Sequence, residues 1–279
     1  MKITETFSPQ LFAGKTVFVT GGGSGINLGI AKNFAAVGAK LAICGRTQAR
    51  LDGAQKKLEA LGAEVFTAVA DVRDYEALAA AFAGTADALG PIHTLVCGAA
   101  GNFLAPAEEL SPNGFKVVVD IDLIGSFNAS RAAFEQLKST EGANLIFISA
   151  GQAFVPYWAQ THAGAAKAGI DNLMQNLAME WGRFGIRSNS IAPGPIEGTE
   201  GMRKLAPEDL SFHQQFKAAI PLGRYGTVDD IGQAAVFLAS PLADYITGTR
   251  LVADGGQNLP GSGIFTAMAL EAMKGERKS

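Results

Sequence analysis

Short apolar runs alternate with longer segments of helical period along most of this chain. The runs are rich in Val, Ile and other apolar residues, which is typical of strands buried on both faces of a parallel sheet. They predict seven strands, at residues 16–20, 40–44, 64–68, 94–97, 144–148, 187–191 and 250–252. The alternation predicts repeated βα units, and therefore an α/β fold: a doubly wound, Rossmann-type domain with a seven-stranded parallel sheet flanked by helices.

Two segments depart from this alternation. Residues 195–221 follow Ala-Pro-Gly-Pro and are rich in charge and glycine, which predicts a mobile flap over a pocket. Residues 261–279 predict an extra C-terminal helix that ends in a charged tail. No linker of Pro, Ser and Gly interrupts the chain, so we expect residues 1–279 to form one domain.

Composition and charge exclude several classes of partner. The formal net charge of −3 offers no basic field for nucleic acid, and the apolar runs are too short to cross a membrane. The two cysteines, Cys44 and Cys97, are too few for a disulfide framework or a zinc site, so we expect no metal centre. The N-terminus lacks a secretory pattern, and the final Arg-Lys-Ser differs from the Ser-Lys-Leu peroxisomal signal. We therefore expect a cytoplasmic protein.

A glycine-rich turn follows the first predicted strand and opens a helical pattern. Glycines allow close approach to a pyrophosphate, and the start of a helix offers free N–H groups and a positive dipole to the anion. This context predicts a dinucleotide site. Its contacts are expected from Gly21, Gly22, Gly23, Ser24, Gly25 and Ile26.

The end of the second predicted strand indicates which dinucleotide binds. An NAD site would place an acidic residue there for the ribose 2′-hydroxyl, whereas this chain has Arg46. A guanidinium suits a 2′-phosphate, which favours NADPH; the alternative is that Arg46 is a solvated surface residue. Asp71 and Val72, at the end of the third strand, are placed to meet the adenine.

These residues, with 97–101 after the fourth strand and 191–194 after the sixth, resemble the short-chain dehydrogenase/reductase family over nearly the whole chain. The resemblance implies further cofactor contacts from Ala99, Lys167, Pro193, Gly194 and Ile196.

Three of the four usual catalytic side chains of that family are replaced. Lys167 remains, but Ala163 stands at the Tyr position, Ala150 at the Ser position and Asp122 at the Asn position. Reduction of a ketone needs an acid near the carbonyl oxygen, such as the missing tyrosine hydroxyl. The replacements therefore weigh against alcohol and ketone chemistry.

The same replacements resemble the family's 2,4-dienoyl-CoA reductases, above all the peroxisomal type. The shared segments are Ala-Ala-Gly-Asn-Phe at 99–103, Asp-Ile-Asp at 120–122, His-Ala-Gly at 162–164, Pro-Gly-Pro-Ile at 193–196 and Gly-Thr-Glu-Gly at 198–201. Asn27 departs from the pattern, because relatives usually have glycine there. The resemblance implies NADPH-dependent reduction of a 2,4-dienoyl-CoA to a 3-enoyl-CoA in the β-oxidation of unsaturated fatty acids.

The resemblance also implies roles for individual residues. Asp122 and Lys167 would hold or charge a water that donates the proton, and Lys167 would bind the nicotinamide ribose. Asn102 or a neighbouring backbone N–H would stabilise the negative thioester oxygen. Two alternatives stay open: Asp122 and Lys167 form only a structural ion pair, and His162 is either the acid or a packing residue. Ser149 is expected to face away, because neighbouring residues at a strand end point to opposite sides.

The expected substrate is a fatty acyl-CoA. Phe103 would line the acyl pocket, Arg73 and Lys204 would meet the CoA phosphates, and Ser111 would border the pantetheine. The family habit implies a homotetramer.

Two other functions remain open from the sequence. One is a 2-enoyl-thioester reductase with the same cofactor and fold. The other is a catalytically silent nucleotide-binding scaffold, since losing the Tyr and Ser is also how an enzyme would decay. The retained Lys167 and the charged Asp122 argue against decay.

Overall fold

The computed structural model describes residues 2–205 and 210–259. Its centre is a parallel sheet in the order β3-β2-β1-β4-β5-β6-β7. The strands are β1 (Thr16–Thr20), β2 (Lys40–Gly45), β3 (Val65–Val69), β4 (Ile92–Cys97), β5 (Asn144–Ile148), β6 (Arg187–Pro193) and β7 (Arg250–Ala253). The predicted fold class and all seven strands are confirmed, with strand ends shifted by at most two residues.

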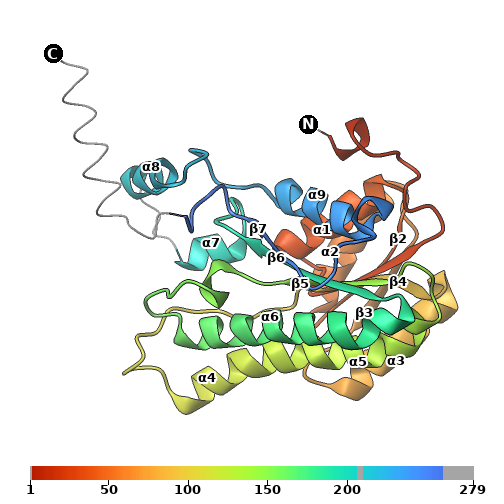
Figure 1. The fold of residues 1–279 in the computed structure, drawn as a ribbon, viewed down its shortest axis with the longest axis horizontal. Helices are drawn as coiled ribbons and strands as arrows, with labels where there is room; N and C mark the ends of the chain where they lie inside the picture. Colours follow the sequence, from red (N-terminus) through yellow and green to blue (C-terminus); the bar gives the residue numbers. More distant parts are fainter. Residues whose placement is uncertain (1, 206–209, 260–279) are drawn as a thin grey trace.

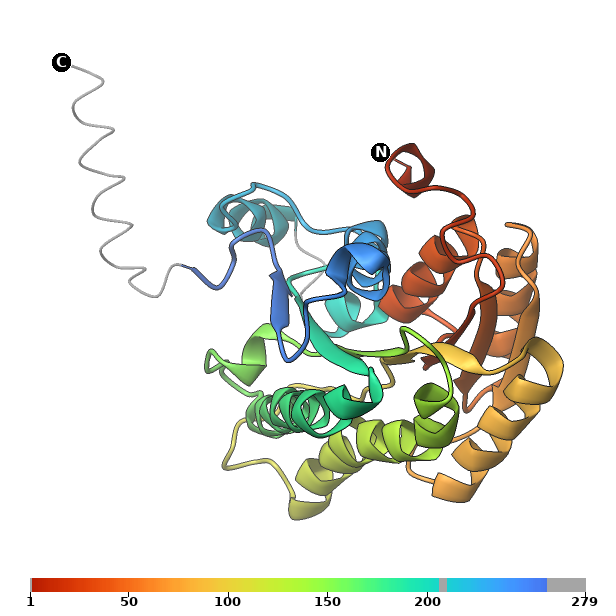
Figure 2. The ribbon, with the colours of Figure 1, turned by 45° about the vertical axis from the view of Figure 1, so that its right-hand side comes forward.

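Helices cover both faces of the sheet (Figures 1 and 2). One face carries α1 (Gly25–Ala36), α2 (Gln48–Glu59) and α9 (Val228–Ala239), and the other carries α3 (Tyr75–Leu89), α5 (Gly125–Lys138) and α6 (Thr161–Trp181). The remaining helices are α4 (Pro112–Val119), α7 (Glu200–Leu205) and α8 (Leu210–Ala219). Short 3-10 turns lie at Ile3–Glu5, Gly151–Ala153, Gly182–Phe184 and Pro241–Ala243.

Two apolar layers, one on each side of the sheet, hold these elements in place. Alternate residues of β1 supply both layers, because Val17 and Val19 pack on the α1 side and Phe18 packs on the α3 side. Helix α1 lies close against α9, where a Cβ on Gly29 would stand 2.5 Å from the Cβ of Val228. The close packing fixes the start of α1 relative to the sheet.

Strand order reverses between β1 and β4. Ligands of doubly wound sheets bind at such a switch point, beyond the carboxyl ends of the strands. The loops after β1, β2, β4, β5 and β6 all leave from this edge, and most of the predicted site residues lie on them.

The long helix beside the sheet is interrupted by a π turn. Helix α4 continues through the π-helical segment η2 (Asp120–Ile124) directly into α5. Such turns are frequent at functional sites, because the extra residue reorients nearby side chains. Here the turn carries Asp122, which is 1% exposed.

The structure describes most of the predicted flap but none of the predicted C-terminal extension. Within residues 195–221 the structure has two helices, α7 and α8, rather than a continuous loop. A role for this segment as a flap stays a prediction. The C-terminal extension, 261–279, lies outside the described residues. In the described parts of the chain no helix is long and apolar enough to cross a membrane.

Candidate active site

The turn after β1 is shaped by glycine backbone rather than by side chains. Gly21 and Gly25 have φ angles of 67° and 56°, in the left-handed region that glycine adopts without strain. A Cβ on Gly22 would lie 2.7 Å from Cγ2 of Ile43. Ser24 begins α1 without a side-chain capping bond. The turn therefore exposes the positive start of α1 and has the form expected of a pyrophosphate site.

The loop after β4 is tied to this turn. The Thr20 hydroxyl accepts hydrogen bonds from the backbone N–H groups of Gly98 and Ala99, at 3.0 and 3.2 Å. Ala99, a predicted cofactor contact, is thus held beside the glycine turn.

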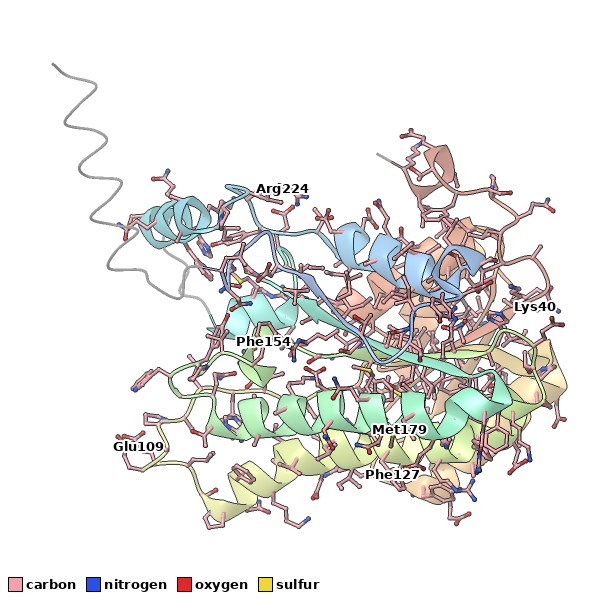
Figure 3. All side chains as sticks on the ribbon, viewed as in Figure 1. Lys40, Glu109, Phe127, Phe154, Met179 and Arg224 are labelled. Carbon is pink, nitrogen blue, oxygen red and sulfur yellow. The ribbon has the colours of Figure 1, made fainter. Side chains whose placement is uncertain are left out.

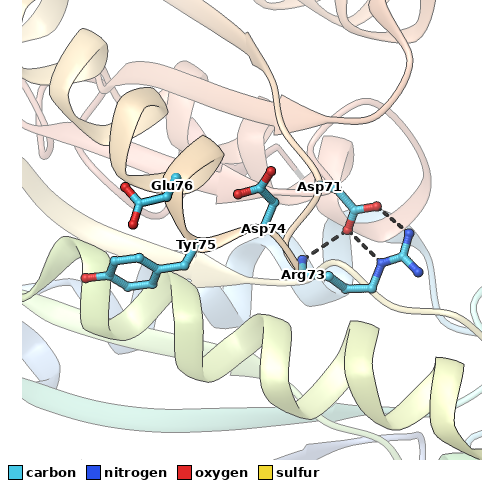
Figure 4. Close-up of a pocket in the computed structure, with 5 residues that line it drawn as sticks. All are labelled: Asp71, Arg73, Asp74, Tyr75 and Glu76. Atoms are coloured by element: carbon cyan, nitrogen blue, oxygen red, sulfur yellow. Dashed lines mark hydrogen bonds and ion pairs between the residues drawn. The ribbon is translucent and has the colours of Figure 1, made fainter.

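The adenosine side of the predicted site lies beyond β2 and β3. Arg46 is exposed and forms no ion pair with any residue that the structure describes. Asp71 accepts two hydrogen bonds from the Arg73 guanidinium, at 3.0 and 2.6 Å, which hold the pKa of Asp71 below its usual value (Figure 4). Val72 is buried against the start of α5. Arg46 therefore has a guanidinium without an ion-pair partner among the described residues, and its contact with a 2′-phosphate stays a prediction.

Arg73 itself lines a shallow surface pocket. The other lining residues, Asp71, Asp74, Tyr75 and Glu76, include three carboxylic acids (Figure 4). A CoA phosphate would have to compete with Asp71 for the Arg73 guanidinium, so the expected CoA contact of Arg73 stays a prediction.

Asp122 and Lys167 form a buried ion pair at the carboxyl ends of β4 and β5. The Oδ2 atom of Asp122 lies 3.1 Å from Nζ of Lys167, and only 10% of the Lys167 side chain is exposed. Oδ1 of Asp122 accepts a hydrogen bond from the Gly101 N–H at 2.7 Å, and Nζ of Lys167 donates to the Ile148 carbonyl at 2.9 Å. The two predicted catalytic residues are therefore brought together and are held by the loop after β4 and by the last residue of β5.

No tyrosine or serine hydroxyl replaces the missing acid at the usual positions. Ala163 is buried and Ala150 half-buried. Tyr157 is on the loop between them, but its hydroxyl donates to Oδ1 of Asn258 at 2.6 Å. Burial raises the pKa of the Tyr157 hydroxyl above its usual value. Ser149 is buried, and its hydroxyl has no partner among the described residues.

The Asn102 amide is oriented by Gln160, a residue that no sequence pattern singled out. Gln160 Nε2 donates to the carbonyls of Phe103 and Ala159, at 3.0 and 3.2 Å, so its Oε1 must act as the acceptor. That Oε1 accepts from Nδ2 of Asn102 at 2.7 Å. Oδ1 of Asn102 is buried without a partner among the described residues. Asn102 therefore keeps one free amide hydrogen and a free acceptor.

His162 is fully buried beneath the same loop. Its ring packs on Phe103 with centroids 4.4 Å apart, and neither ring nitrogen has a partner among the described residues. Burial lowers the pKa of His162, which favours the neutral ring. A neutral imidazole is a poor proton donor, which makes His162 a weaker candidate for the acid than the sequence allowed.

The remaining predicted residues have different surroundings. A Cβ on Gly194 would lie 2.6 Å from the Asp254 Cα, and Ile196 is buried, so the segment after Pro193 is held against the end of β7. Ser111 caps α4 by accepting from the Gly114 N–H at 3.0 Å. The Lys204 side chain lies outside the described part of the structure. Contacts of these residues with ligands stay predictions.

The expectation of no metal centre concerns clusters of ligating side chains. In residues 2–205 and 210–259 no cluster of three or more His, Cys, Asp or Glu side chains could hold a metal ion.

A family model and individual relatives in other organisms match most of this chain. Residues 21–258 match the family model described as enoyl-(acyl carrier protein) reductase. The peroxisomal 2,4-dienoyl-CoA reductase of Saccharomyces cerevisiae, named as (3E)-enoyl-CoA-producing, is 44% identical over 91% of this chain and 88% of its own length. The enzyme of the same name from Arabidopsis thaliana is 42% identical over 90% of this chain and 86% of its own length.

Solved structures agree with the fold and with dinucleotide binding in the family. A short-chain dehydrogenase from Bacillus anthracis is 37% identical, with a TM-score of 0.80 over 89% of this chain and 98% of that protein. A short-chain oxidoreductase from Pseudomonas aeruginosa, 29% identical, has a TM-score of 0.83 over 88% of this chain and 97% of its own. It was solved with NADPH bound and is described as containing an atypical catalytic centre.

These comparisons also correct the expected location. The expectation of a cytoplasmic protein is wrong, because the yeast and Arabidopsis relatives are both named as peroxisomal enzymes. That expectation depended on the lack of a secretory pattern, on the two cysteines and on the final Arg-Lys-Ser.

The matched model, the sequence identities and the shared fold together establish that this chain belongs to the short-chain dehydrogenase/reductase family.

Proposed function

We propose that the protein reduces 2,4-dienoyl-CoA thioesters to 3-enoyl-CoA with NADPH, in the oxidation of unsaturated fatty acids. The observation that carries this proposal is the buried Asp122–Lys167 pair beside alanines at both hydroxyl positions. A site of this kind keeps a charged pair able to handle a proton but lacks the hydroxyl acid of ketone reductases. The names of the yeast and Arabidopsis relatives support the same substrate.

The reaction adds one hydride and one proton to the conjugated thioester. The bound dinucleotide would supply the hydride, which is added at the δ-carbon of the acyl chain. The electron pair of the γ,δ double bond then forms a β,γ double bond, and the α,β pair forms a double bond between the α-carbon and the carbonyl carbon. The π pair of the carbonyl moves onto the thioester oxygen, which gives a dienolate. Protonation at the α-carbon then gives the 3-enoyl product.

Asp122 and Lys167 have the geometry to hold a water for that protonation. Each carboxylate oxygen of Asp122 already has one partner, and an oxygen of this kind has a second lone pair for another donor. Lys167 keeps one hydrogen beyond the two that it directs at Ile148 and Asp122. The two groups lie 3.1 Å apart, so we assign the proton donor to the pair with a bound water.

The developing negative charge on the thioester oxygen needs a fixed donor. The Gly101 N–H is occupied by Asp122, which leaves the free amide hydrogen of Asn102 as the first candidate. Gln160 holds that amide in place, so Gln160 acts as a positioning residue for Asn102. A preoriented donor of this kind contributes about 3 kcal/mol to catalysis in other enzymes.

We assign the preference for NADPH to Arg46, which is exposed and unpaired among the described residues. Gly21, Gly22, Gly23, Ser24, Gly25 and Ile26 would hold the pyrophosphate, and Asp71 and Val72 the adenine. Ala99, Lys167, Pro193, Gly194 and Ile196 would contact the nicotinamide half.

For the fatty acyl-CoA, we propose that Phe103 lines the acyl pocket. Its ring packs on the buried His162 and is 38% exposed, which leaves apolar surface for an acyl chain to cover. Arg73, Ser111 and Lys204 are the proposed contacts of the CoA moiety.

The protein is proposed to assemble as a homotetramer. Large apolar side chains lie exposed on the outer helices, among them Phe127 on α5 and Met179 on α6, which are 46% and 76% exposed (Figure 3). Light scattering on the purified protein tests this assembly, and a monomer would contradict it.

The experiment that tests the function is anaerobic NADPH consumption with ketones, 2-enoyl-CoAs and 2,4-dienoyl-CoAs. The proposal predicts turnover of the dienoyl-CoAs well above that of the other two classes. Preference for 2-enoyl-CoAs would favour the alternative of a 2-enoyl-thioester reductase, which the description of the matched family model also suggests. Binding of NADPH without turnover of any class would indicate a catalytically silent scaffold.

A further inference from the structure

Asn27 is the third residue of α1, and its side chain joins two loops of the predicted cofactor site. Its Nδ2 donates to the Gly98 carbonyl at 2.8 Å, in the loop after β4. The same atom lies 3.4 Å from the Gly21 carbonyl, in the turn after β1. These two carbonyls belong to segments that are far apart in sequence and that the fold places on either side of the switch point.

Asn27 fits only because Gly98 has no side chain. A Cβ on Gly98 would lie 2.1 Å from Oδ1 and 2.5 Å from Cγ of Asn27. Both distances are far below any real contact, so the side chain of Asn27 occupies the space that a residue at 98 would otherwise need. Asn27 and Gly98 are therefore complementary, and a change at one position should alter what the other tolerates.

Both backbone polar groups of Gly98 are hydrogen-bonded to side chains. Its N–H donates to the Thr20 hydroxyl at 3.0 Å, and its carbonyl accepts from Asn27. Gly98 is buried, so water would not replace this donor if residue 27 were apolar, and the carbonyl would lose its hydrogen bond. The next residue, Ala99, begins the stretch that continues through Gly101 to Asn102.

We propose that Asn27 is a positioning residue that sets the distance between the pyrophosphate turn and the loop after β4. It would thereby align the nicotinamide half of the dinucleotide relative to the half already bound by the turn. The proposal depends on the proposed function only in taking a nicotinamide dinucleotide as the ligand. It predicts that loss of the Asn27 amide weakens binding of the whole dinucleotide more than binding of its adenosine half.

The first test is the variant Asn27→Leu, which keeps the branched shape and removes both hydrogen bonds. Calorimetry would measure binding of NADPH, NADH and adenosine 2′,5′-bisphosphate, which lacks the nicotinamide half. We expect the Kd of whichever dinucleotide the wild type binds to rise about tenfold, the size of one lost hydrogen bond. The Kd of adenosine 2′,5′-bisphosphate should change less than twofold.

Asn33 offers a matched control on the same helix. It is buried, and its Nδ2 donates to Asp229 on α9 at 2.9 Å, away from the cofactor loops. Asn33→Leu should lower the melting temperature and leave the ratio of the two Kd values unchanged. An equal ratio for Asn27→Leu and the wild type would overturn the positioning role, because that result is what a purely structural asparagine gives.

The second test is a double-mutant cycle, which also covers the case in which Asn27→Leu does not fold. Gly98→Ala alone should lower the melting temperature, because the new Cβ displaces the Asn27 side chain and its hydrogen bonds. In an Asn27→Gly background, Gly98→Ala should lower the melting temperature much less. Equal losses in both backgrounds would overturn the complementarity of the two residues. Neither test uses turnover, so failure of the dienoyl-CoA assay and failure of this proposal are separate results.

Discussion

Arg46 is the residue that should decide between the two nicotinamide dinucleotides. Its guanidinium follows β2, where no acidic residue is present to repel a 2′-phosphate. Arg46→Ala should raise the Kd of NADPH about tenfold or more and change the Kd of NADH little, because only NADPH carries the phosphate. Direct binding titrations with both cofactors measure this. Equal losses for both would show that Arg46 is only a surface residue.

Asp122 is the residue on which the proposed proton transfer depends. Asp122→Asn is isosteric, so a merely structural ion pair predicts a change in stability with a nearly normal chemical step. A proton-handling role predicts that single-turnover reduction falls 10²- to 10⁴-fold, because an amide cannot relay a proton in this way. NADPH binding should stay intact. Near-normal reduction in a folded variant would remove Asp122 from the mechanism.

Lys167→Ala serves as the comparison for Asp122→Asn. Lys167 is assigned both the proton-handling pair and the nicotinamide ribose, so its loss should lower turnover and also raise the Kd of NADPH. The two variants together separate the two roles.

At this scale the family pattern selected residues that lie together in the structure, but it did not reveal their hydrogen bonds. Asp122 and Lys167 could be selected because the family pattern places them, and the structure brings them within 3.1 Å. The role of Gln160 could not be predicted, because its partner Asn102 is 58 residues away and amides carry no signal in a pattern of apolar residues. The contact between Asn27 and Gly98, 71 residues apart, was hidden for the same reason.

Among the elements, strands were predictable and the π turn was not. Strands of a buried parallel sheet are continuous apolar runs, so β1 and β5 could be bounded exactly from hydrophobicity. The π turn at Asp120–Ile124 has the sequence Asp-Ile-Asp-Leu-Ile, which contains no glycine or proline to mark a change in the helix. The helices of the 195–221 segment were missed because charge and glycine there resemble a loop.

The start of α5 is placed by a glycine. A Cβ on Gly125 would lie 2.5 Å from Cγ2 of Val72, which belongs to the predicted adenine site. Gly125→Ala should therefore destabilise the protein by about 1–3 kcal/mol, the usual cost of overpacking, and weaken NADPH binding by displacing Val72.

Gly53 on α2 is the matched control for Gly125. A Cβ there would meet nothing within 4 Å, so Gly53→Ala should stabilise the helix by up to about 1 kcal/mol. Denaturant unfolding of both variants measures the difference. A neutral Gly125→Ala would contradict the close contact between α5 and the loop after β3.

For the molecule as a whole, buried histidines predict sensitivity to acid. Burial, with the nearby charges of Lys15 and Arg187, lowers the pKa of His93 to about 4 from 6.5. Below pH 6.5, His93 binds a proton in the unfolded chain but not in the folded protein. The free energy of unfolding should therefore fall as the pH drops from 6.5 towards 4. Each such proton contributes a slope of about 1.4 kcal/mol per pH unit.

The variant His93→Asn isolates this contribution, because asparagine takes up no proton in that range. Urea unfolding at pH 6.5, 5.5 and 4.5 should show a shallower decline for the variant than for the wild type. Parallel declines would mean that His93 is already accessible to protons in the folded state.

The central claim for the whole protein is the position at which hydride and proton enter the substrate. It is tested most directly by reducing a 2,4-dienoyl-CoA with NADPH that carries deuterium in place of the transferred hydride, and again with unlabelled NADPH in D₂O. NMR and mass spectrometry of the products then locate each label. The account predicts cofactor deuterium on the δ-carbon, solvent deuterium on the α-carbon and a remaining double bond between the β- and γ-carbons. Cofactor deuterium on the β-carbon, or no reduction of the dienoyl thioester, would contradict it.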